Sequence, residues 1–423
     1  MGTMQEENRI LVIKICSIWA LTAGSWAVLS INTPLLLDEI AGKEVSPTWQ
    51  GVFTATTALS GMLFCGVGGY YSDRVGRMEF LIPWMIIFSL STVFVACSTV
   101  YKSVFLLWIA RVPALSIPST IIHAILADYM SESALMETYG YATATFGISV
   151  LVSSSLCGLI SLYISRLAAI IFAAFLAFGG LLLTVITKLP SRVRPQLHSK
   201  NLQEELVLLS KPPTRVTDGL LKIYRNTQLR NFILALVLLR TGNTNIQSLL
   251  VLFLAYRLKW KTPEVSALMV VGSLVVIGVQ LLGVKCVLTN NKACVVLIIS
   301  LSLAPLVAMA YAFAMSATEM YAVAVMSSLL TISGTILDTK VAALASESNS
   351  TGLVLGCVGT LHNSLDVVTS LSLGRLMSWS FSSYPPSSVM SGLPFVVNSA
   401  IYVASLLIVT HTKYRLHILH EER

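Results

Sequence analysis

The ionisable residues most suggestive of chemistry lie inside long apolar runs. His362, Asn363 and Asp366 occupy positions i, i+1 and i+4, which places the histidine and the carboxylate on one helix face, a turn apart. Arg240 lies about nine residues, roughly 13 Å, into another run, too deep for its charge to reach water easily. Burial favours a protonated carboxylate and a nearby arginine favours an ionised one, a competition that suits proton binding and release. We therefore expect Asp366 to pair with Arg240 while His362 tunes or relays the proton; a static ion pair is the alternative.

The segment that follows Arg240 is polar for a helix centre. Residues 241–247 read Thr-Gly-Asn-Thr-Asn-Ile-Gln. A glycine beside Asn and Thr at membrane depth is typical of an unwound turn that lines a cavity. We expect Asn243, Asn245 and Gln247 to line a substrate path there, with a polar stripe that packs helices together as the alternative.

Three residues of the N-terminal half are further candidates for this path. Arg111, which precedes Val-Pro-Ala-Leu-Ser-Ile-Pro, either is buried as a functional charge or reaches the outer interface. Trp26 and Asn32 belong to the first apolar run, where they would face the cavity and a substrate, or where the indole would anchor the helix at the interface. We assign Asp338 to the inner interface, with a gate role as the alternative, and His123 to packing.

Motifs of catalysis are missing. The sequence has no P-loop, HExxH, GxSxG or His/Cys set at metal-ligand spacing, which argues against an ATP-driven pump and an intramembrane enzyme. Its seven cysteines are scattered without a CxxC and predict neither disulfides nor a metal site. The net charge of +8 collects in loops rather than on a basic face. We expect no enzyme activity, no cofactor, no metal and no nucleic-acid partner.

The composition places these residues in a membrane. Of 423 residues, 55% are hydrophobic and 11% charged, and the mean hydropathy is +0.78. A bilayer core about 30 Å thick needs about 20 apolar residues per helix. Twelve such runs are present: 10–36, 49–71, 80–98, 104–127, 139–163, 167–186, 232–255, 265–287, 293–314, 320–344, 352–377 and 393–410. We predict an all-α membrane protein with twelve transmembrane helices.

Charge asymmetry orients these helices. With the N-terminus inside, about 19 Lys and Arg residues fall on the cytoplasmic side and about seven on the other, so we expect both termini in the cytoplasm. A polar, proline-containing stretch divides six runs from six, which suggests two bundles with a site between them at midplane. The predicted parts are an N-terminal six-helix bundle over 1–187, a cytoplasmic middle loop over 188–231, a C-terminal six-helix bundle over 232–411 and a cytoplasmic tail over 412–423.

The second run ends in a charged turn with a distinctive spacing, Gly-Tyr-Tyr-Ser-Asp-Arg-Val-Gly-Arg over residues 69–77. Its second glycine can reverse the chain with a positive φ, and its charges can form and break ion pairs with helix ends. Gly-x-x-x-Asp-Arg-x-Gly-Arg resembles the signature loop of the major facilitator superfamily, whose members have twelve helices, a middle loop and an internal N-terminus. By that resemblance, Asp73 and Arg77 lock the cytoplasmic gate of the outward-facing state. The gate motif comprises Gly69, Asp73, Arg74, Gly76, Arg77 and Asp128.

The segment over residues 127–147 extends the resemblance. Its Ala-Asp-Tyr-Met-Ser-Glu, Tyr-Gly and Ala-Thr-Phe-Gly are similar to the tetracycline-exporter-like branch, including its hippocampus-abundant-transcript relatives, and imply that Asp128 accepts one of the two motif arginines. Two departures concern the coupling. Ser153-Ser154 and Cys157-Gly158 stand where exporters usually carry Gly-Pro and Gly-Gly pairs, and the first run lacks the acid that proton-coupled exporters often place there.

Three hypotheses about function follow. The first is a secondary transporter that moves a small organic solute by alternating access with proton-coupled efflux, and the second is an uncoupled facilitator of a small metabolite. The third, from another class, is a transporter-like scaffold or escort that moves nothing. The expected partners are a small-molecule substrate, protons under the first hypothesis, and the lipid bilayer; we expect a monomer.

Overall fold

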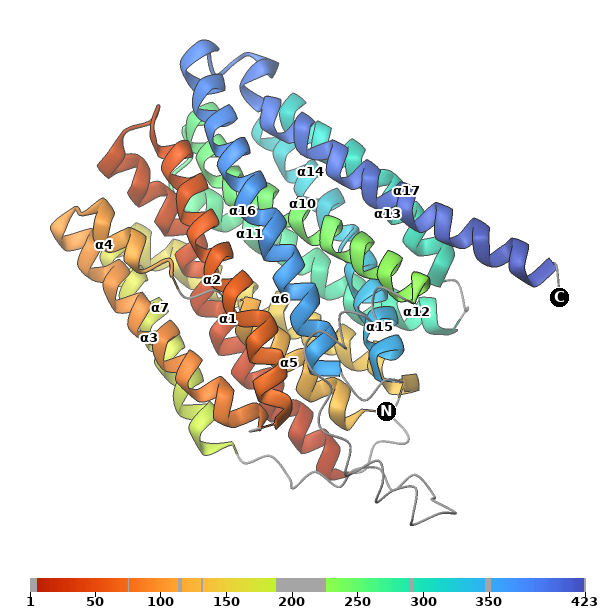
Figure 1. Cartoon of the computed structure of the whole chain (residues 1–423). Helices are drawn as coiled ribbons and strands as arrows, with labels where there is room; N and C mark the ends of the chain where they lie inside the picture. Colours follow the sequence, from red (N-terminus) through yellow and green to blue (C-terminus); the bar gives the residue numbers. More distant parts are fainter. Residues whose placement is uncertain are drawn as a thin grey trace.

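The computed structural model describes residues 6–74, 76–112, 116–130, 132–187, 226–289, 293–346 and 351–421. Throughout these ranges the regular structure is helical and there is no strand. The helices lie side by side in one group, and consecutive long helices run in opposite directions (Figure 1). The predicted all-α fold is confirmed. Most of the predicted middle loop lies outside the described residues.

The N-terminal bundle contains α1 (Glu6–Ala41), α2 (Ser46–Arg74), α3 (Arg77–Tyr101), α4 (Val104–Ile109), α5 (Ser116–Tyr129), α6 (Glu132–Tyr163) and α7 (Arg166–Ile186). The run predicted over 104–127 is therefore two helices. In the sequence, Pro113 comes between the two helices, and Pro118 lies in the first turn of α5. Proline lacks a backbone N–H and disfavours helical geometry in the preceding residue, which explains why α4 does not continue into α5.

The C-terminal bundle contains α10 (Thr227–Arg257), α11 (Thr262–Gly278), the π-helical turn η1 (Val279–Gly283), α12 (Val284–Thr289), α13 (Ala293–Phe313), α14 (Ala317–Leu329), α15 (Ile332–Ser346), α16 (Thr351–Ser383), the 3₁₀ turn η2 (Val389–Gly392) and α17 (Leu393–Glu421). α10 begins before the predicted start at Phe232. Asn226 explains the earlier start, because its side chain accepts the Leu229 N–H at 3.1 Å and caps the helix.

Within the ranges that the structure describes, eight spans are long and apolar enough to cross a membrane by length and composition. The remaining predicted runs correspond to the broken pair α4 and α5 and to α2, α10 and α16. These last three have 29, 31 and 33 residues, so their length is sufficient. They carry many of the polar side chains of the candidate path, which pack against other helices instead of lipid.

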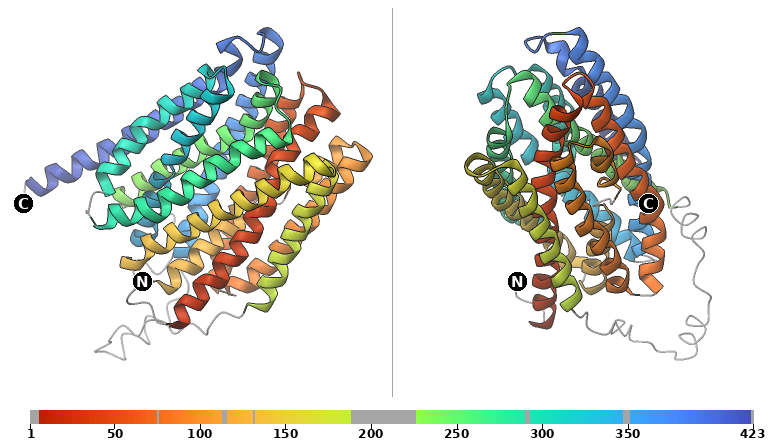
Figure 2. Two further views of the ribbon diagram at one scale, coloured as in Figure 1. Left: turned by 180° about the vertical axis from the view of Figure 1, so that it is seen from behind. Right: turned by 90° about the vertical axis from the view of Figure 1, so that its left-hand side faces the viewer.

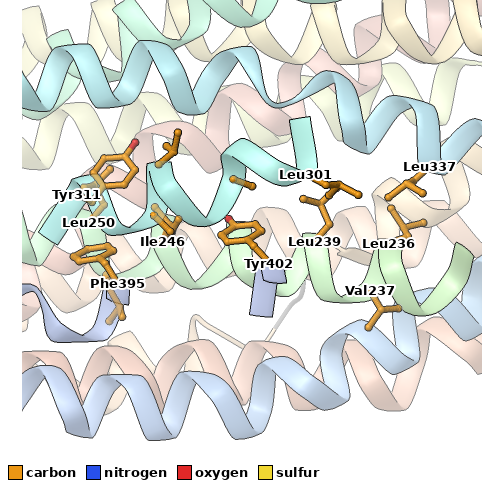
Figure 3. Close-up of a cluster of buried hydrophobic side chains, with 14 of the residues drawn as sticks. Leu236, Val237, Leu239, Ile246, Leu250, Leu301, Tyr311, Leu337, Phe395 and Tyr402 are labelled. Atoms are coloured by element: carbon orange, nitrogen blue, oxygen red, sulfur yellow. The ribbon is translucent and has the colours of Figure 1, made fainter. Parts of the chain in front are cut away.

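Each bundle has an apolar core, and Figure 2 shows the two bundles side by side. The core of the C-terminal bundle continues into buried residues of α1, α5 and α6. In the C-terminal bundle, Leu236, Leu301 and Leu337 are fully buried between α10, α13 and α15 (Figure 3). In the N-terminal bundle, Ile15 and Leu81 are fully buried between α1 and α3.

The most extensive contacts between the bundles are those of α2 with α16 and of α6 with α11. α2 and α16 lie side by side along most of their lengths (Figure 1). Their backbones approach so closely at Gly51 that a Cβ there would lie 2.6 Å from the Ser370 carbonyl oxygen and 3.2 Å from the Gly374 Cα. Small residues permit such close approach where no water drives helices together.

Candidate transport path and gate

Asp366 and His362 form a buried polar pair on the side of α16 that faces α10. His362 Nε2 lies 3.5 Å from Asp366 Oδ2 and 3.4 Å from Thr244 Oγ1. The Asp366 side chain is 3% exposed, and the Thr241 hydroxyl lies beside it. Among the described residues, neither Asp366 Oδ1 nor Thr241 Oγ1 has a hydrogen-bond partner of acceptable geometry. A carboxylate oxygen left unpaired at this depth is costly, and proton binding removes that cost.

Arg240 pairs with Asp338 and not with Asp366. Its Nη2 donates to Asp338 Oδ1 at 2.6 Å, which links α10 to α15. The predicted Arg240–Asp366 pair is therefore wrong, because α15 brings another carboxylate to the guanidinium while Asp366 turns toward His362. The assignment of Asp338 to the lipid interface is wrong as well, since its side chain is only 19% exposed and faces the bundle interior.

The polar segment of α10 is continuous helix, so the predicted unwound turn is not formed. Its polar groups find partners on α17 instead. Asn245 Nδ2 donates to Asn398 Oδ1 at 3.0 Å, and Asn398 Nδ2 donates to the Gly242 carbonyl oxygen at 3.0 Å. The Tyr402 hydroxyl donates to Asn243 Oδ1 at 2.7 Å. With these bonds made between helices, Asn243 and Asn245 form the packing stripe that was the alternative.

Gln247 and Asn363 differ in their surroundings. Gln247 is exposed on α10. Asn363 is buried at the contact between the bundles, where its Nδ2 donates to the Gly359 carbonyl oxygen at 2.7 Å and its amide packs on Gly61 of α2. Gln247 therefore remains available to a solute, whereas Asn363 is occupied with helix packing.

The aromatic residues of α1 pack on α6. Trp26 is tilted against Phe146 with ring centroids 5.8 Å apart, and Trp19 stacks on the same ring at 5.8 Å. Trp26 keeps a partly exposed edge. Asn32 is fully buried, and its Nδ2 lies 3.1 Å from Cys157 Sγ. Asn32 thus does not face a cavity as expected, because it packs against α6.

Arg111 lies just after α4, at the break before α5, and not in a helix centre. Its carbonyl oxygen accepts the Thr57 hydroxyl at 2.6 Å, which holds this segment against α2. Its Nε is buried and has no hydrogen-bond partner in the part of the chain that the structure describes. A guanidinium placed in this way has donors available for an anion.

The gate motif forms an ion pair at the start of α3. Gly76 has φ +135°, as the turn requires. Arg77 Nε donates to Asp128 Oδ2 at 3.0 Å and its Nη1 donates to Ser72 Oγ at 2.7 Å. Asp128 was expected to accept one of the two motif arginines, and the structure pairs it with Arg77. Gly69 lies within α2, and the side chains of Asp73 and Arg74 lie outside the described part.

Asp338 and His123, which the sequence assigns to the interface and to packing, lie on α15 and α5, helices of different bundles. The charge of Asp338 on α15 acts on the His123 ring on α5, across the contact between the bundles. No spacing rule relates residues of different bundles, and each residue alone resembles an ordinary packing or interface position. Only the tertiary fold brings the charge of Asp338 near enough to act on this ring.

Comparisons with known proteins agree with this architecture. A family model described as Major Facilitator Superfamily matches residues 15–370. The Multidrug resistance protein 1 of Bacillus subtilis (strain 168) is 23% identical over 194 residues, 45% of this chain and 48% of that protein, so the chain spans about half the length of this curated relative. The crystal structure of the human organic anion transporter MFSD10 (TETRAN) is similar with a TM-score of 0.70 and 15% identity, over 96% of this chain and 100% of that one. At that identity the likeness shows the fold.

Proposed function

The chain belongs to the major facilitator superfamily and is a multi-pass membrane transporter of a small-molecule solute, not an enzyme; from this premise we propose that it carries an organic solute by alternating access. The moving parts are the bundles over 1–187 and 232–411, joined by the middle loop over 188–231, with the tail 412–423 and both termini in the cytoplasm. They rock about a site between them. Most of the buried apolar residues in each cluster belong to one bundle, which supports this division.

The carrier couples solute movement to protons at Asp366. The observation that supports this is the Asp366 Oδ1 atom, which is buried without a hydrogen-bond partner among the described residues. His362 Nε2, 3.5 Å from the other carboxylate oxygen, can pass a proton to or from the carboxylate. Arg240 is held by Asp338 and leaves Asp366 free to change its protonation state.

The solute is an organic anion. Arg111 supplies a positive charge that no carboxylate of the described chain pairs with, and its buried Nε lacks a partner there. Trp26, partly exposed on α1, offers an aromatic surface for the organic part, and Gln247, exposed on α10, offers an amide. The structural neighbour MFSD10 carries organic anions according to its title. Because Asp366 is neutral when protonated, proton binding there raises the positive potential of the interior and favours an anion.

Flux measurements in proteoliposomes test this function. The purified chain is reconstituted, and uptake and efflux of radiolabelled organic anions, cations and neutral solutes are followed with and without a pH gradient. Gradient-dependent flux of an anion is the expected result. Anion flux that does not depend on the pH gradient would identify an uncoupled facilitator. The absence of flux for every solute would favour the scaffold or escort that moves nothing.

The substitution Asp366→Asn separates coupling from transport. This variant should exchange labelled for unlabelled anion at equal pH, but the pH gradient should no longer increase its uptake. Asp38→Asn is the matched control, because Asp38 lies at the end of α1 and accepts the Ser46 hydroxyl at 3.1 Å. Gradient-driven uptake that persists in Asp366→Asn would show that another group binds the coupled proton.

A further inference from the structure

The Thr244 hydroxyl of α10 has its partner on α16 and not on its own helix. Threonine hydroxyls in these helices commonly donate to the carbonyl oxygen four residues earlier, as Thr360 does to Gly356 at 3.0 Å. Among the described residues, Thr244 Oγ1 instead contacts the His362 ring, with Nε2 at 3.4 Å. This half-buried hydroxyl is therefore available to the ring as a hydrogen-bond partner.

His362 Nε2 lies between two oxygens at nearly equal distances. Asp366 Oδ2, on the same helix, is 3.5 Å away, and Thr244 Oγ1, on α10, is 3.4 Å away. A ring nitrogen carries at most one hydrogen, so it forms one strong hydrogen bond at a time. An ionised carboxylate is a stronger acceptor than a hydroxyl, whereas a protonated carboxyl has lost that advantage. The preferred partner of Nε2 therefore depends on the protonation state of Asp366.

The chemistry of the two partners determines where the hydrogens lie. An ionised carboxylate can only accept, so Nε2 carries the hydrogen when Asp366 is ionised. A charged imidazolium at this depth is costly, which keeps the ring neutral. The carboxylate oxygen without a partner in the described chain is Oδ1, and the Thr241 hydroxyl beside Asp366 is likewise without one. A proton on Oδ1 gives both of these atoms a partner.

Other helices bring further charged and titratable groups to α16. Arg240 of α10 is the charge that acts on His362, and its guanidinium is held by Asp338 of α15 at 2.6 Å. Other titratable side chains on the helices that pack against α16 include Cys65 of α2, His123 of α5 and Tyr402 of α17. Substitutions at Thr244 leave all of these groups in place, so their effects on proton binding can be assigned to the hydroxyl.

We propose that Thr244 is a positioning residue for proton binding at Asp366, because it accepts the His362 Nε2 hydrogen when the carboxyl becomes neutral. In the ionised state, Nε2–H donates to Asp366 Oδ2. A proton from water then adds to Oδ1 and forms one O–H bond, and no other covalent bond differs between the two states. Nε2–H turns to Thr244 Oγ1, so a hydrogen bond within α16 is replaced by one between α16 and α10. The assignment rests on the proton coupling at Asp366 proposed above.

The Thr244 hydroxyl stabilises the protonated state more than the ionised one. Without it, proton binding leaves the buried Nε2–H with only the weak acceptor of a neutral carboxyl, whereas the ionised state keeps its strong acceptor. An unmet buried donor is unfavourable by enough to lower the proton affinity of Asp366 about tenfold, or about one pH unit. Serine keeps the hydroxyl and should keep the affinity, whereas valine keeps only the shape.

Infrared titration of the full-length chain in lipid nanodiscs measures this affinity directly. The carbonyl stretch of the protonated carboxyl, assigned by its loss in Asp366→Asn, gives the pH at which Asp366 is half protonated. Thr244→Val should move this midpoint about one pH unit lower, and Thr244→Ser should leave it close to that of the unmodified chain. Thr360→Val is the matched control, because the Thr360 hydroxyl bonds within its own helix, and it should not move the midpoint.

Nitrogen-15 NMR follows the ring hydrogen, with the signal assigned by His362→Gln. We expect Nε2 to stay protonated throughout and to change its shift at the Asp366 midpoint, and Thr244→Val should reduce that change. An unmoved midpoint in Thr244→Val, a midpoint in Thr244→Ser that matches the valine variant, or an Nε2 that loses its hydrogen at low pH overturns the role of Thr244. Neither readout needs a solute. A moved midpoint without flux would therefore contradict only the proposed transport, and gradient-dependent flux with an unmoved midpoint would contradict only the role of Thr244.

Discussion

Arg240 and Asp338 form a 2.6 Å ion pair between α10 and α15, inside the C-terminal bundle. Their side chains are 32% and 19% exposed, so the pair is neither a surface contact nor fully desolvated. It holds Arg240 away from Asp366. Arg240 and Asp366, the two ionisable groups that the sequence places deepest in the C-terminal half, therefore belong to separate polar pairs. Asp366 pairs with His362 within α16, and Arg240 pairs with Asp338 between α10 and α15.

Removing one charge of the Arg240–Asp338 pair should lower the stability of the folded chain more than removing both charges. Arg240→Gln and Asp338→Asn each leave one charge without its partner in a poorly solvated place, whereas the double variant leaves none. We expect each single variant to lower the unfolding temperature in detergent by several degrees and the double variant to recover part of the loss.

Arg166→Gln is the matched control for these variants. Arg166 pairs with Glu39 at 2.8 Å, but the Glu39 side chain is 62% exposed, and such surface pairs contribute about 0–1 kcal/mol. The unfolding temperature of the Arg166→Gln variant should therefore stay close to that of the unmodified chain. Strictly additive losses in the Arg240 and Asp338 variants would show that the two charges are not coupled.

The sequence predicts the architecture well because apolar length, loop charge and the Gly-x-x-x-Asp-Arg-x-Gly-Arg motif are local properties. It also predicts the i, i+4 relation of His362 and Asp366, which helix geometry fixes. It does not predict the partner of Arg240, since that depends on which of two carboxylates the packing of α15 and α16 brings nearer. Distances between helices follow from side-chain packing along the whole bundle, and no short pattern encodes them.

The polar stripe of α10 shows the same limit. Asn245 looks like a cavity residue when only its own helix is considered. Its partner Asn398 is far away in the sequence and lies in a run whose pattern is apolar. The continuous helix is favoured because α17 satisfies these groups, which removes the reason for an unwound turn.

Asn398→Ala should destabilise the C-terminal bundle. Asn398 is 1% exposed, accepts from Asn245 and donates to the Gly242 carbonyl oxygen. Alanine leaves the buried Asn245 amide without its acceptor, at a cost of about 1–3 kcal/mol. Tyr402→Phe is the milder comparison, because it removes one hydroxyl bond to the exposed Asn243. The unfolding temperature of Asn398→Ala should be lower than that of Tyr402→Phe. The reverse order would contradict the packing role of the stripe.

Gly51→Ala should weaken the contact between α2 and α16. The added Cβ would meet the Ser370 carbonyl oxygen at 2.6 Å, and backbone cannot move aside as a flexible side chain can, so the helices must separate. Gly278→Ala is the control, because a Cβ at this helical glycine meets nothing within 4 Å and alanine favours the helix by about 0.5–1 kcal/mol. Gly51→Ala should lower the unfolding temperature and the rate of solute exchange, whereas Gly278→Ala should retain both. Equal behaviour of the two variants would show that the α2–α16 contact is loose.

Arg257 connects the ends of α10, α13, α16 and α17 by hydrogen bonds at the side opposite the termini. It is 8% exposed, and its guanidinium lies over the Phe253 ring at 4.4 Å. Its five N–H donors meet five oxygens at 2.6–3.2 Å: the carbonyls of Ala312, Ala314, Pro386 and Ser388 and the Ser391 hydroxyl. Two of these carbonyls belong to the C-terminal end of α13, where a cation is favoured. The others hold the connection between α16 and α17.

Arg257→Lys should not restore these five hydrogen bonds, although lysine keeps the positive charge. An ammonium has three donors at one point and cannot reach acceptors spread around a planar fork, so buried carbonyls lose partners at about 1–3 kcal/mol each. We expect the largest fall in unfolding temperature of any Arg-to-Lys change in the chain, together with faster hydrogen exchange in η2 (Val389–Gly392). Arg375→Lys, on the exposed face of α16, should leave both unchanged. If Arg257→Lys matched that control, charge rather than the guanidinium geometry would hold the α16–α17 connection in place.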